Sequence, residues 1–448
     1  MFFVLDTHVN ANMEGKEDSM TPLKNDDELQ SIDEKDIEKE DDGLSMFMAC
    51  LNLFGTGLGT GIVTLPYAFK LIGGVVSALS FCLVTVISAL SAVLLSLAYT
   101  TVFVGSNHMR APYRDMMEIA YGKYGRYLFV VLFSASMFIS SIGLLSLVTH
   151  TILSIIAQGE KLKNVPFWGI CLIVTIFSSC ASLYRSPKRF KGISTMASLA
   201  AVFLACMVMA DTIYFQHNVK QTRLLPVATH TSRAADFFSA LGIILFAFSS
   251  TFVLPTVQAD MKEPASMPYS AVMANIGISI GYAIPVVTAY CVLSGPSIQP
   301  SLLETFTASQ LYRESIVFKV IVILSQLSLT IHILGVIVIV LNPLCLQVEE
   351  IFNVADTLNW RRVVVRFTLN FLVFLAAIVF PSFIDVLSIC GGVFAIQLCI
   401  TFPALIFARV HEKLHGFFKF ILYVAAVVAV LISIVIFTVG LMKMKENT

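Results

Sequence analysis

Long apolar stretches alternate with short polar ones from residue 44 almost to the end of the chain. A helix needs about 20 mostly apolar residues to cross the hydrocarbon core of a bilayer. Eleven stretches reach this length, and we predict a membrane-spanning helix for each. They are residues 45–70, 73–104, 125–157, 165–184, 190–215, 234–259, 266–294, 315–345, 361–380, 383–408 and 416–441. Glycine or proline residues interrupt the first, sixth and tenth of them.

The composition agrees with this pattern. Apolar residues make up 57% of the chain and charged residues 13%. Soluble domains are about 45–50% apolar and about 25% charged. A chain with this little charge lacks the polar surface that a soluble body of 448 residues would need, so a soluble enzyme or nucleic-acid binder is excluded as a description of the whole chain. The sequence therefore predicts an all-α integral membrane protein.

Charge is concentrated at the N-terminus. Residues 1–43 carry 14 Asp and Glu but only 4 Lys, and such a segment cannot bury enough apolar surface to fold. We therefore predict a disordered acidic tail over 1–43, a membrane domain over 44–441 and a short C-terminal tail over 442–448. A cytosolic partner for residues 1–43 is one interpretation of the tail, and a solvated leader is the other.

Lysine and arginine counts in the polar connections predict the orientation. With eleven spans, the connections on the side of the N-terminal tail hold 15 Lys and Arg, and those on the opposite side hold 10. Basic residues are enriched in cytoplasmic loops. The N-terminus is therefore predicted to be cytosolic and the C-terminus to lie across the membrane. The plasma membrane and the vacuolar or lysosomal membrane fit equally well, because transport from either compartment could use the same proton gradient into the cytosol.

The first span contains a run of alternating glycines, Gly55, Gly57, Gly59 and Gly61, followed by Leu65-Pro66. Each glycine costs up to about 1 kcal/mol in a helix relative to alanine. A small-residue packing face would need glycine only at every fourth position, whereas these four point around the whole helix. The pattern favours local unwinding over packing.

A related pattern occurs in the sixth span. Phe246-Ala247-Phe248-Ser249-Ser250-Thr251 comes shortly before Leu254-Pro255, as the glycine run comes before Leu65-Pro66. Interrupted helices at corresponding positions of two halves indicate the binding site of a transporter. Five spans begin with each interrupted helix if the eleventh is an appendage, which predicts a five-plus-five inverted repeat with broken helices 1 and 6.

The two breaks suit a zwitterion. The half-helix that begins near Gly61 would present free N–H groups and a positive dipole end, which favour a carboxylate. The carbonyl groups of residues 246–249 would favour an ammonium group. Unwound backbone at membrane depth is tolerated where it lines a cavity, so these groups are predicted to face one.

Three motifs stand out in the chain: Gly59-Thr60-Gly61-Ile62 with Leu65-Pro66-Tyr67-Ala68-Phe69, Leu245-Phe246-Ala247-Phe248 with Met261-Lys262-x-Pro264, and Tyr121-Gly122-x-x-Gly125-Arg126. Together they resemble a known family, the amino acid/auxin permeases of the amino acid–polyamine–organocation superfamily. It covers roughly residues 44–441. The resemblance implies eleven helices, an inverted-repeat fold and secondary transport of amino acids by alternating access. It places the substrate site on Gly57, Gly59, Thr60, Gly61, Ile62, Phe246, Phe248 and Ser249.

The resemblance does not decide the coupling ion. Sodium-driven relatives have an asparagine four residues before the Gly-Ser/Thr-Gly triplet, where this chain has Gly55. His332 is the ionisable residue near the middle of a predicted span, and its unperturbed pKa suits a proton relay. We predict proton coupling with His332 as the candidate residue, and sodium remains the alternative. A hydrogen-bonded structural histidine is the competing interpretation.

Other features of the sequence restrict the class of substrate and the type of function. No Asp or Glu lies at mid-depth in the first, third, sixth, eighth or tenth predicted span, which favours small neutral amino acids. Gln326 and Gln397 are predicted to form hydrogen bonds between helices, and Glu349-Glu350 is interpreted as a solvated helix end. The sequence has no enzyme motif, so no catalytic residue, cofactor or metal site is predicted. An amino acid sensor that signals through the acidic tail is the main alternative to a symporter.

Overall fold

The computed structural model describes residues 43–103, 111–156, 165–183, 187–219, 234–293, 298–354 and 359–447. The predicted acidic tail lies outside these residues, apart from Gly43. Regular structure within them is helical throughout. In chain order the helices are α2 (Met46–Gly57), α3 (Gly61–Ile72), α4 (Gly74–Val102), α5 (Pro112–Ile156), α6 (Phe167–Ser182), α7 (Pro187–Asn218), α8 (Ala234–Ala247), η2 (Ser249–Val253), α9 (Leu254–Ala259), η3 (Pro264–Ser266), α10 (Met267–Val292), α11 (Leu302–Ala308), α12 (Gln310–Glu314), α13 (Ile316–Ile351), α14 (Trp360–Val379), α15 (Phe383–Ile389), η5 (Cys390–Ala395), η6 (Gln397–Thr401), α16 (Phe402–Val410) and α17 (Gly416–Asn447).

These helices account for the predicted spans. Eight are long and apolar enough to cross a membrane, and two bent pairs raise the number to 10. The bent pairs are α2 with α3, and α8 with η2 and α9. The shorter apolar helix α6, with 16 residues, occupies the predicted fourth span. The prediction of broken first and sixth spans is therefore confirmed, and α17 continues through most of the predicted C-terminal tail.

The spans form two sets of five that run in opposite directions. The first set is the α2/α3 pair followed by α4, α5, α6 and α7. The second set is the α8–α9 pair followed by α10, α13, α14 and the span from Phe383 to Val410. Because an odd number of crossings separates the starts of the two sets, the second set enters from the opposite side. The five-plus-five inverted repeat follows from this arrangement.

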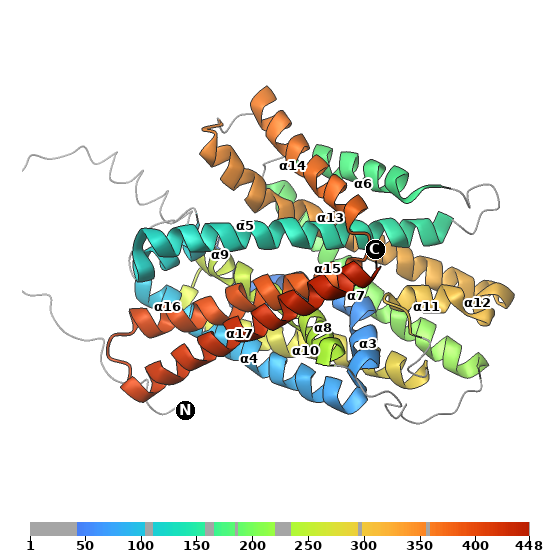
Figure 1. Cartoon of the computed structure of the whole chain (residues 1–448), viewed down its shortest axis with the longest axis horizontal. Helices are drawn as coiled ribbons and strands as arrows, with labels where there is room; N and C mark the ends of the chain where they lie inside the picture. The colour runs from blue at the N-terminus through green and yellow to red at the C-terminus, as the bar shows by residue number, and fades with distance from the viewer. Residues whose placement is uncertain are drawn as a thin grey trace, which may run out of the picture. The chain divides into compact units, whose positions relative to one another are not determined.

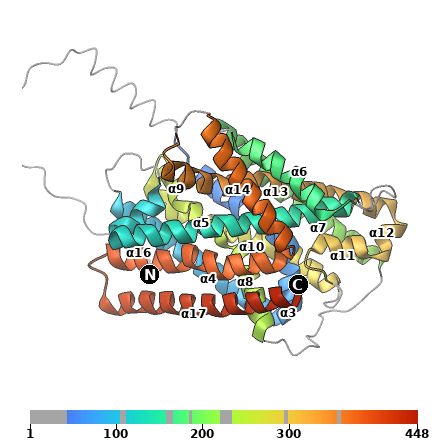
Figure 2. The ribbon, with the colours of Figure 1, turned by 45° about the horizontal axis from the view of Figure 1, so that its top comes forward.

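We name the two ends of the bundle after helices that lie there. The α9 end holds the start of α2, the end of α13 and the end of α16, and the α11 end holds the end of α3 and the start of α13. Two contacts identify them: Leu44 N donates to Asp260 O across 2.7 Å at the α9 end, and Lys70 Nζ donates to Ile298 O across 2.7 Å at the α11 end. Figures 1 and 2 show α9 and α16 toward the left, and α11 and α12 at the right.

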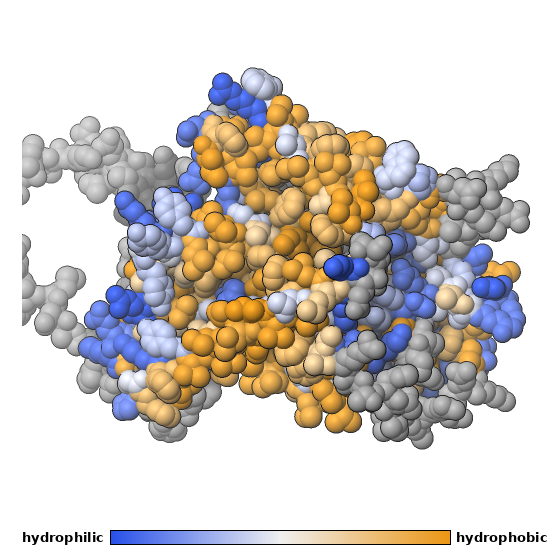
Figure 3. Space-filling model, viewed as in Figure 1, coloured by the Kyte–Doolittle hydropathy of each residue, from blue (hydrophilic) through white to orange (hydrophobic). Residues whose placement is uncertain are grey.

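Apolar side chains cover the middle of the visible face, and hydrophilic side chains gather toward its two ends (Figure 3). Exposed large apolar side chains are numerous on α4, α10, α14 and α17. A band of this kind matches the hydrocarbon core of a bilayer, where a helix exposes apolar side chains and bonds its own backbone.

The tenth span is buried along most of its length and departs from regular α-helix. Residues Cys390–Ala395 and Gln397–Thr401 are π-helical. A side chain on Gly391 would lie 2.0 Å from the carbonyl oxygen of Gly242 in α8.

The prediction that Gln397 forms a hydrogen bond between helices is confirmed, because its amide donates to Ser433 Oγ of α17 across 2.7 Å. Gln326 likewise donates to Ser154 Oγ of α5 across 2.9 Å.

Candidate functional site

The first break lies between α2 and α3, whose axes differ by 55°. The α2 helix remains regular through Gly57, and Leu58 turns into an extended conformation with φ −81° and ψ 126°. No side chain caps the start of α3. The chain is therefore unwound only over residues 58–60. At the start of α3 the N–H groups of Ile62 and Val63 donate to Gly59 O and Thr60 O, across 3.0 and 3.2 Å.

The glycines of the run admit side chains from other helices onto this backbone. A Cβ atom on Gly55 would lie 2.0 Å from Ser198 Oγ of α7, and one on Gly57 would lie 2.3 Å from the side chain of Ile278 in α10. At Gly55 and Gly57, which lie within the regular part of α2, glycine is thus required for close approach of the neighbouring helices. At Gly55, where sodium-driven relatives have an asparagine, the Ser198 side chain fills the space that a larger residue would take.

Tyr282 of α10 joins the two sides of the first break. Its hydroxyl group donates to Gly57 O across 2.5 Å and accepts from Gly59 N–H across 3.2 Å. The ring also packs against Gly61, where a Cβ atom would lie 2.7 Å away. Two backbone groups freed by the unwinding are satisfied in this way. The role of Tyr282 was not predicted, because nothing in the sequence of the α10 segment distinguishes it from a core tyrosine.

The second break lies at Phe248, between α8 and the 3-10 turn η2, with a bend of 41°. Two of its carbonyl groups are already engaged: Phe248 O accepts from Ser88 Oγ at 3.3 Å, and Ser249 O accepts from Cys399 Sγ at 3.2 Å. Among the carbonyls expected to hold an ammonium group, those of Phe246 and Ala247 belong to residues that line the cavity described next.

Both breaks border one large cavity of about 960 Å³. From the breaks it extends to the α9 end, where Arg114, Glu350 and Asn353 line it. Its inner part is walled by small and apolar residues of α5, α7, α8 and α13, among them Leu144, Ala197 and Val336. The charged lining residues are therefore confined to the mouth, and the inner chamber offers backbone groups and hydroxyls.

The predicted substrate residues divide into two groups around this cavity. Gly57, Gly59, Thr60, Phe246 and Ser249 line it. The remaining three lie behind its wall: Gly61, Ile62 and Phe248 are buried, and the Phe248 ring packs against Phe81 and Tyr282 at centroid distances of 5.2 and 6.0 Å. The structure thus places Phe248 as a support of the break rather than as part of the cavity surface.

His332 of α13 lies directly against the first break. Its Nδ1 donates to Ala197 O of α7 across 2.8 Å, and its Nε2 would be 2.1 Å from a Cβ atom on Gly59. A neutral imidazole that donates from Nδ1 carries no proton on Nε2. His332 also lines the cavity. The geometry therefore aims an unprotonated ring nitrogen at the unwound backbone.

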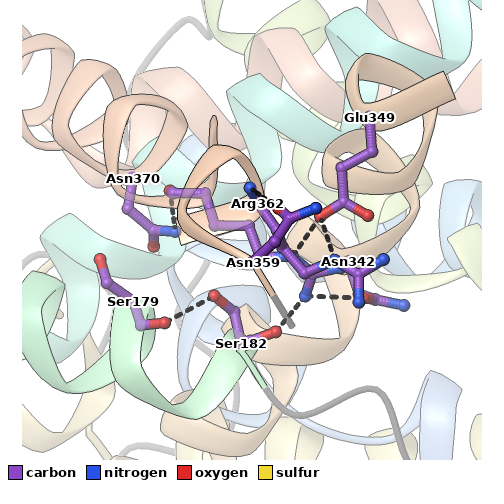
Figure 4. Close-up of polar contacts among 8 residues, drawn as sticks. Ser179, Ser182, Asn342, Glu349, Asn359, Arg362 and Asn370 are labelled. Atoms are coloured by element: carbon purple, nitrogen blue, oxygen red, sulfur yellow. Dashed lines mark hydrogen bonds and ion pairs between the residues drawn. The ribbon is translucent and has the colours of Figure 1, made fainter. Parts of the chain in front are cut away.

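A buried ionic cluster adjoins the mouth of the cavity and ties α13 to α14 and α6 (Figure 4). Arg366 donates from Nε to Glu349 Oε1 across 2.6 Å and from Nη1 to Ser182 O and Asn342 Oδ1. Arg362 Nε lies 3.4 Å from the same Glu349 oxygen. The interpretation of Glu349 as a solvated helix end was wrong, because two arginines of the following span cover it. Glu350 is exposed at 61% of its side chain, as expected for such an end.

A second, smaller cavity of about 340 Å³ lies on the other side of the breaks, at the α11 end. Tyr67 of α3, Ser239 of α8, Asp385 of α15 and Lys443 of α17 are among its lining residues. Lys443 Nζ pairs with Asp236 Oδ1 at the start of α8, across 2.9 Å. No residue lines both cavities, so the backbone around the two breaks separates them.

The family described as "Transmembrane amino acid transporter protein" matches residues 42–445. This chain belongs to that family. Its multi-pass helical architecture agrees with that description, and the resemblance noted in the sequence is confirmed.

Similar proteins of known name agree with the family. The amino acid transporter AVT6D of Arabidopsis thaliana is 24% identical over 418 residues, covering 87% of this chain and 92% of the relative. AVT6B of the same plant is 22% identical over 405 residues, covering 85% and 86%. The putative sodium-coupled neutral amino acid transporter 8 of Xenopus tropicalis is 22% identical over 386 residues, covering 81% and 84%.

The fold also has a counterpart among solved structures. The crystal structure of MhsT in complex with L-phenylalanine superposes with a TM-score of 0.54 at 13% identity, covering 88% of this chain and 98% of that one. At this identity the likeness concerns the fold alone.

Proposed function

We propose that this protein is a secondary transporter that carries small neutral amino acids by alternating access and couples their movement to protons through His332. The observation that supports the proposal most is the cavity of about 960 Å³ that ends at both helix breaks and is bordered there by His332. The α9 end would be cytosolic, in line with the excess of basic residues there. The cavity would then face the cytosol.

The recognition groups follow from the backbone. The start of α3 offers the positive end of a helix dipole to a carboxylate. The carbonyls of Phe246 and Ala247 offer acceptors to an ammonium group. Because the inner chamber lacks a charged side chain, a cationic or anionic substrate side chain would be desolvated without a counter-charge. Neutral amino acids are therefore favoured.

Two features support protons over sodium. Ser198 fills the space beside Gly55 that the asparagine of sodium-driven relatives would need. The Nε2 atom of His332 is free to take up a proton beside Gly59, and doing so would place a cation against the break. Alternating access is supported by the two cavities, which approach the breaks from opposite ends of the bundle.

The test is uptake of labelled neutral amino acids into proteoliposomes under an imposed pH gradient and, separately, a sodium gradient. We expect accumulation with the pH gradient and its loss in His332→Gln. The variant should still exchange labelled for unlabelled amino acid, since exchange needs no net proton movement. His150→Ala is the control, because His150 lies near the α11 end of α5 and bonds to Pro381 O.

Three results would contradict the proposal. Accumulation under sodium alone would show that the space beside Gly55 was misinterpreted. Proton-driven uptake that survives in His332→Gln would show that His332 is not the coupling residue. Amino acid binding without any flux would favour a sensor, and deletion of residues 1–43 would then be expected to abolish its signalling.

A further inference from the structure

A line of polar contacts joins α7 and α13 between the first break and the α11 end. His332 bonds to Ala197 O at 2.8 Å, Ser328 Oγ donates to Ala200 O at 2.6 Å, and Ser325 Oγ donates to Asp211 Oδ2 at 2.6 Å. Spacings of three and four residues put the three α13 side chains on one helix face. We call Asp211, Ser325, Ser328 and His332 the α7–α13 seam.

Asp211 is unusual within this seam. It is fully buried, with 0% of its surface exposed, and its Oδ1 atom has no hydrogen-bond partner. Among the residues that the structure describes, no Lys, Arg or His forms an ion pair with it. An ionised carboxylate without a counter-charge is expensive at membrane depth. The vacant Oδ1 is therefore suited to carrying a proton.

The neighbouring titratable groups on the helices packed against α7 have other partners. Lys319 of α13 lies over the Tyr312 ring, and Lys70 of α3 donates to Ile298 O. Tyr282 of α10 spans the first break, and the α10 residue Tyr290 packs against Phe69. The α2 helix contributes only Cys50, near the α9 end, and Tyr67 of α3 faces the smaller cavity. Within this set, His332 is the titratable group on the same seam as Asp211.

The position of the seam complements that of the main cavity. His332 is reached from the α9 end through the cavity, whereas Asp211 lies only seven residues, about 10 Å, before the end of α7 at the α11 end. Along α13, Ser325 and His332 are also about 10 Å apart. The seam thus crosses the half of the bundle through which the main cavity does not pass.

We propose that Asp211 is a second proton-binding residue of the transport cycle, which takes up a coupling proton from the α11 side on its Oδ1 atom. The inference rests on the proton coupling proposed above. Uptake forms one O–H bond and converts the carboxylate to the neutral acid, and release breaks that bond and restores the carboxylate. The Ser325 hydroxyl group, which donates to Oδ2, stabilises the carboxylate form.

The test compares two assays in proteoliposomes made with the full chain. For Asp211→Asn, which keeps the size and the hydrogen bond, we expect accumulation under a pH gradient to fall at least tenfold. Exchange of labelled for unlabelled amino acid should stay within about twofold of the original protein, as should the thermal midpoint. A merely structural role would instead lower exchange and accumulation together. Thr212→Val is the matched control, because Thr212 is equally buried next to Asp211 but bonds only to Val208 O of its own helix.

Ser325→Ala keeps the carboxyl group and removes its partner. We expect the pH at which uptake is half-maximal to shift in this variant and not in Thr212→Val, so the inference is tested even if Asp211→Asn fails to fold. Accumulation that survives in Asp211→Asn, or an unchanged pH profile in Ser325→Ala, would overturn the role of Asp211 alone. Exchange without proton-driven accumulation in the unmodified protein would overturn the coupling, and this inference with it.

Discussion

The contact between Gly59 and His332 allows a sharp test of the site geometry. In Gly59→Ala the new Cβ atom would lie 2.1 Å from His332 Nε2, whereas ordinary contacts begin at 3.4 Å. The imidazole would have to move by more than 1 Å. Its bond from Nδ1 to Ala197 O, at 2.8 Å, would then be strained or lost. Overpacking of a core costs about 1–3 kcal/mol, and a buried polar group left without its partner costs about 1–3 kcal/mol more. The variant should therefore be destabilised by about 2–6 kcal/mol.

The assay is thermal unfolding of the purified protein in detergent, monitored by the loss of the monodisperse peak in size-exclusion chromatography. Because unfolding of such proteins is often irreversible, all variants must be heated at the same rate. Gly169→Ala in α6 is the control, since the nearest atom to its Cβ would be 3.6 Å away. That variant should unfold within a degree or two of the original protein.

The double variant Gly59→Ala/His332→Ala tests whether the clash with His332 causes the loss of stability. Removing the imidazole removes the clash, so the two substitutions together should cost about 1–3 kcal/mol less than the sum of their separate effects. Additive effects, or a Gly59→Ala variant as stable as Gly169→Ala, would refute the placement of His332 against the break.

Two further substitutions test other parts of the structure. Glu349→Gln leaves Arg366 and Arg362 buried without their counter-charge and should destabilise the protein by about 3–5 kcal/mol. Glu350→Gln breaks only an exposed pair with Arg114 and should cost less than about 1 kcal/mol; equal thermal shifts for the two variants would contradict the buried cluster. Tyr282→Phe removes the hydroxyl group between Gly57 O and Gly59 N–H, and should destabilise the protein by about 1–3 kcal/mol in the same thermal assay. Tyr269→Phe, at an exposed position of the same helix, should leave the thermal midpoint unchanged.

The sequence was sufficient to place the spans and their breaks. The length of an apolar stretch and the presence of glycine are local properties that act directly on helix formation in a bilayer. The run from Gly55 to Gly61 therefore predicted the first break, and the smaller break at Phe248 followed from its similar place before Leu-Pro. Gln326 and Gln397 were predictable in the same way, because an isolated polar side chain in an apolar span needs a partner on another helix.

The tertiary structure decided which residues meet at the breaks. Tyr282 reaches Gly57 across 225 positions of sequence, and Ser325 reaches Asp211 across 114; no local pattern marks such pairs. Glu349 looks solvated in the sequence, yet its carboxylate is buried because Arg366 and Arg362 follow on the next helix and fold over it. Apolar length and glycine content thus determine where the helices cross the membrane and where they unwind. Hydrogen bonds between helices that are distant in the sequence determine which polar side chains contact the unwound backbone.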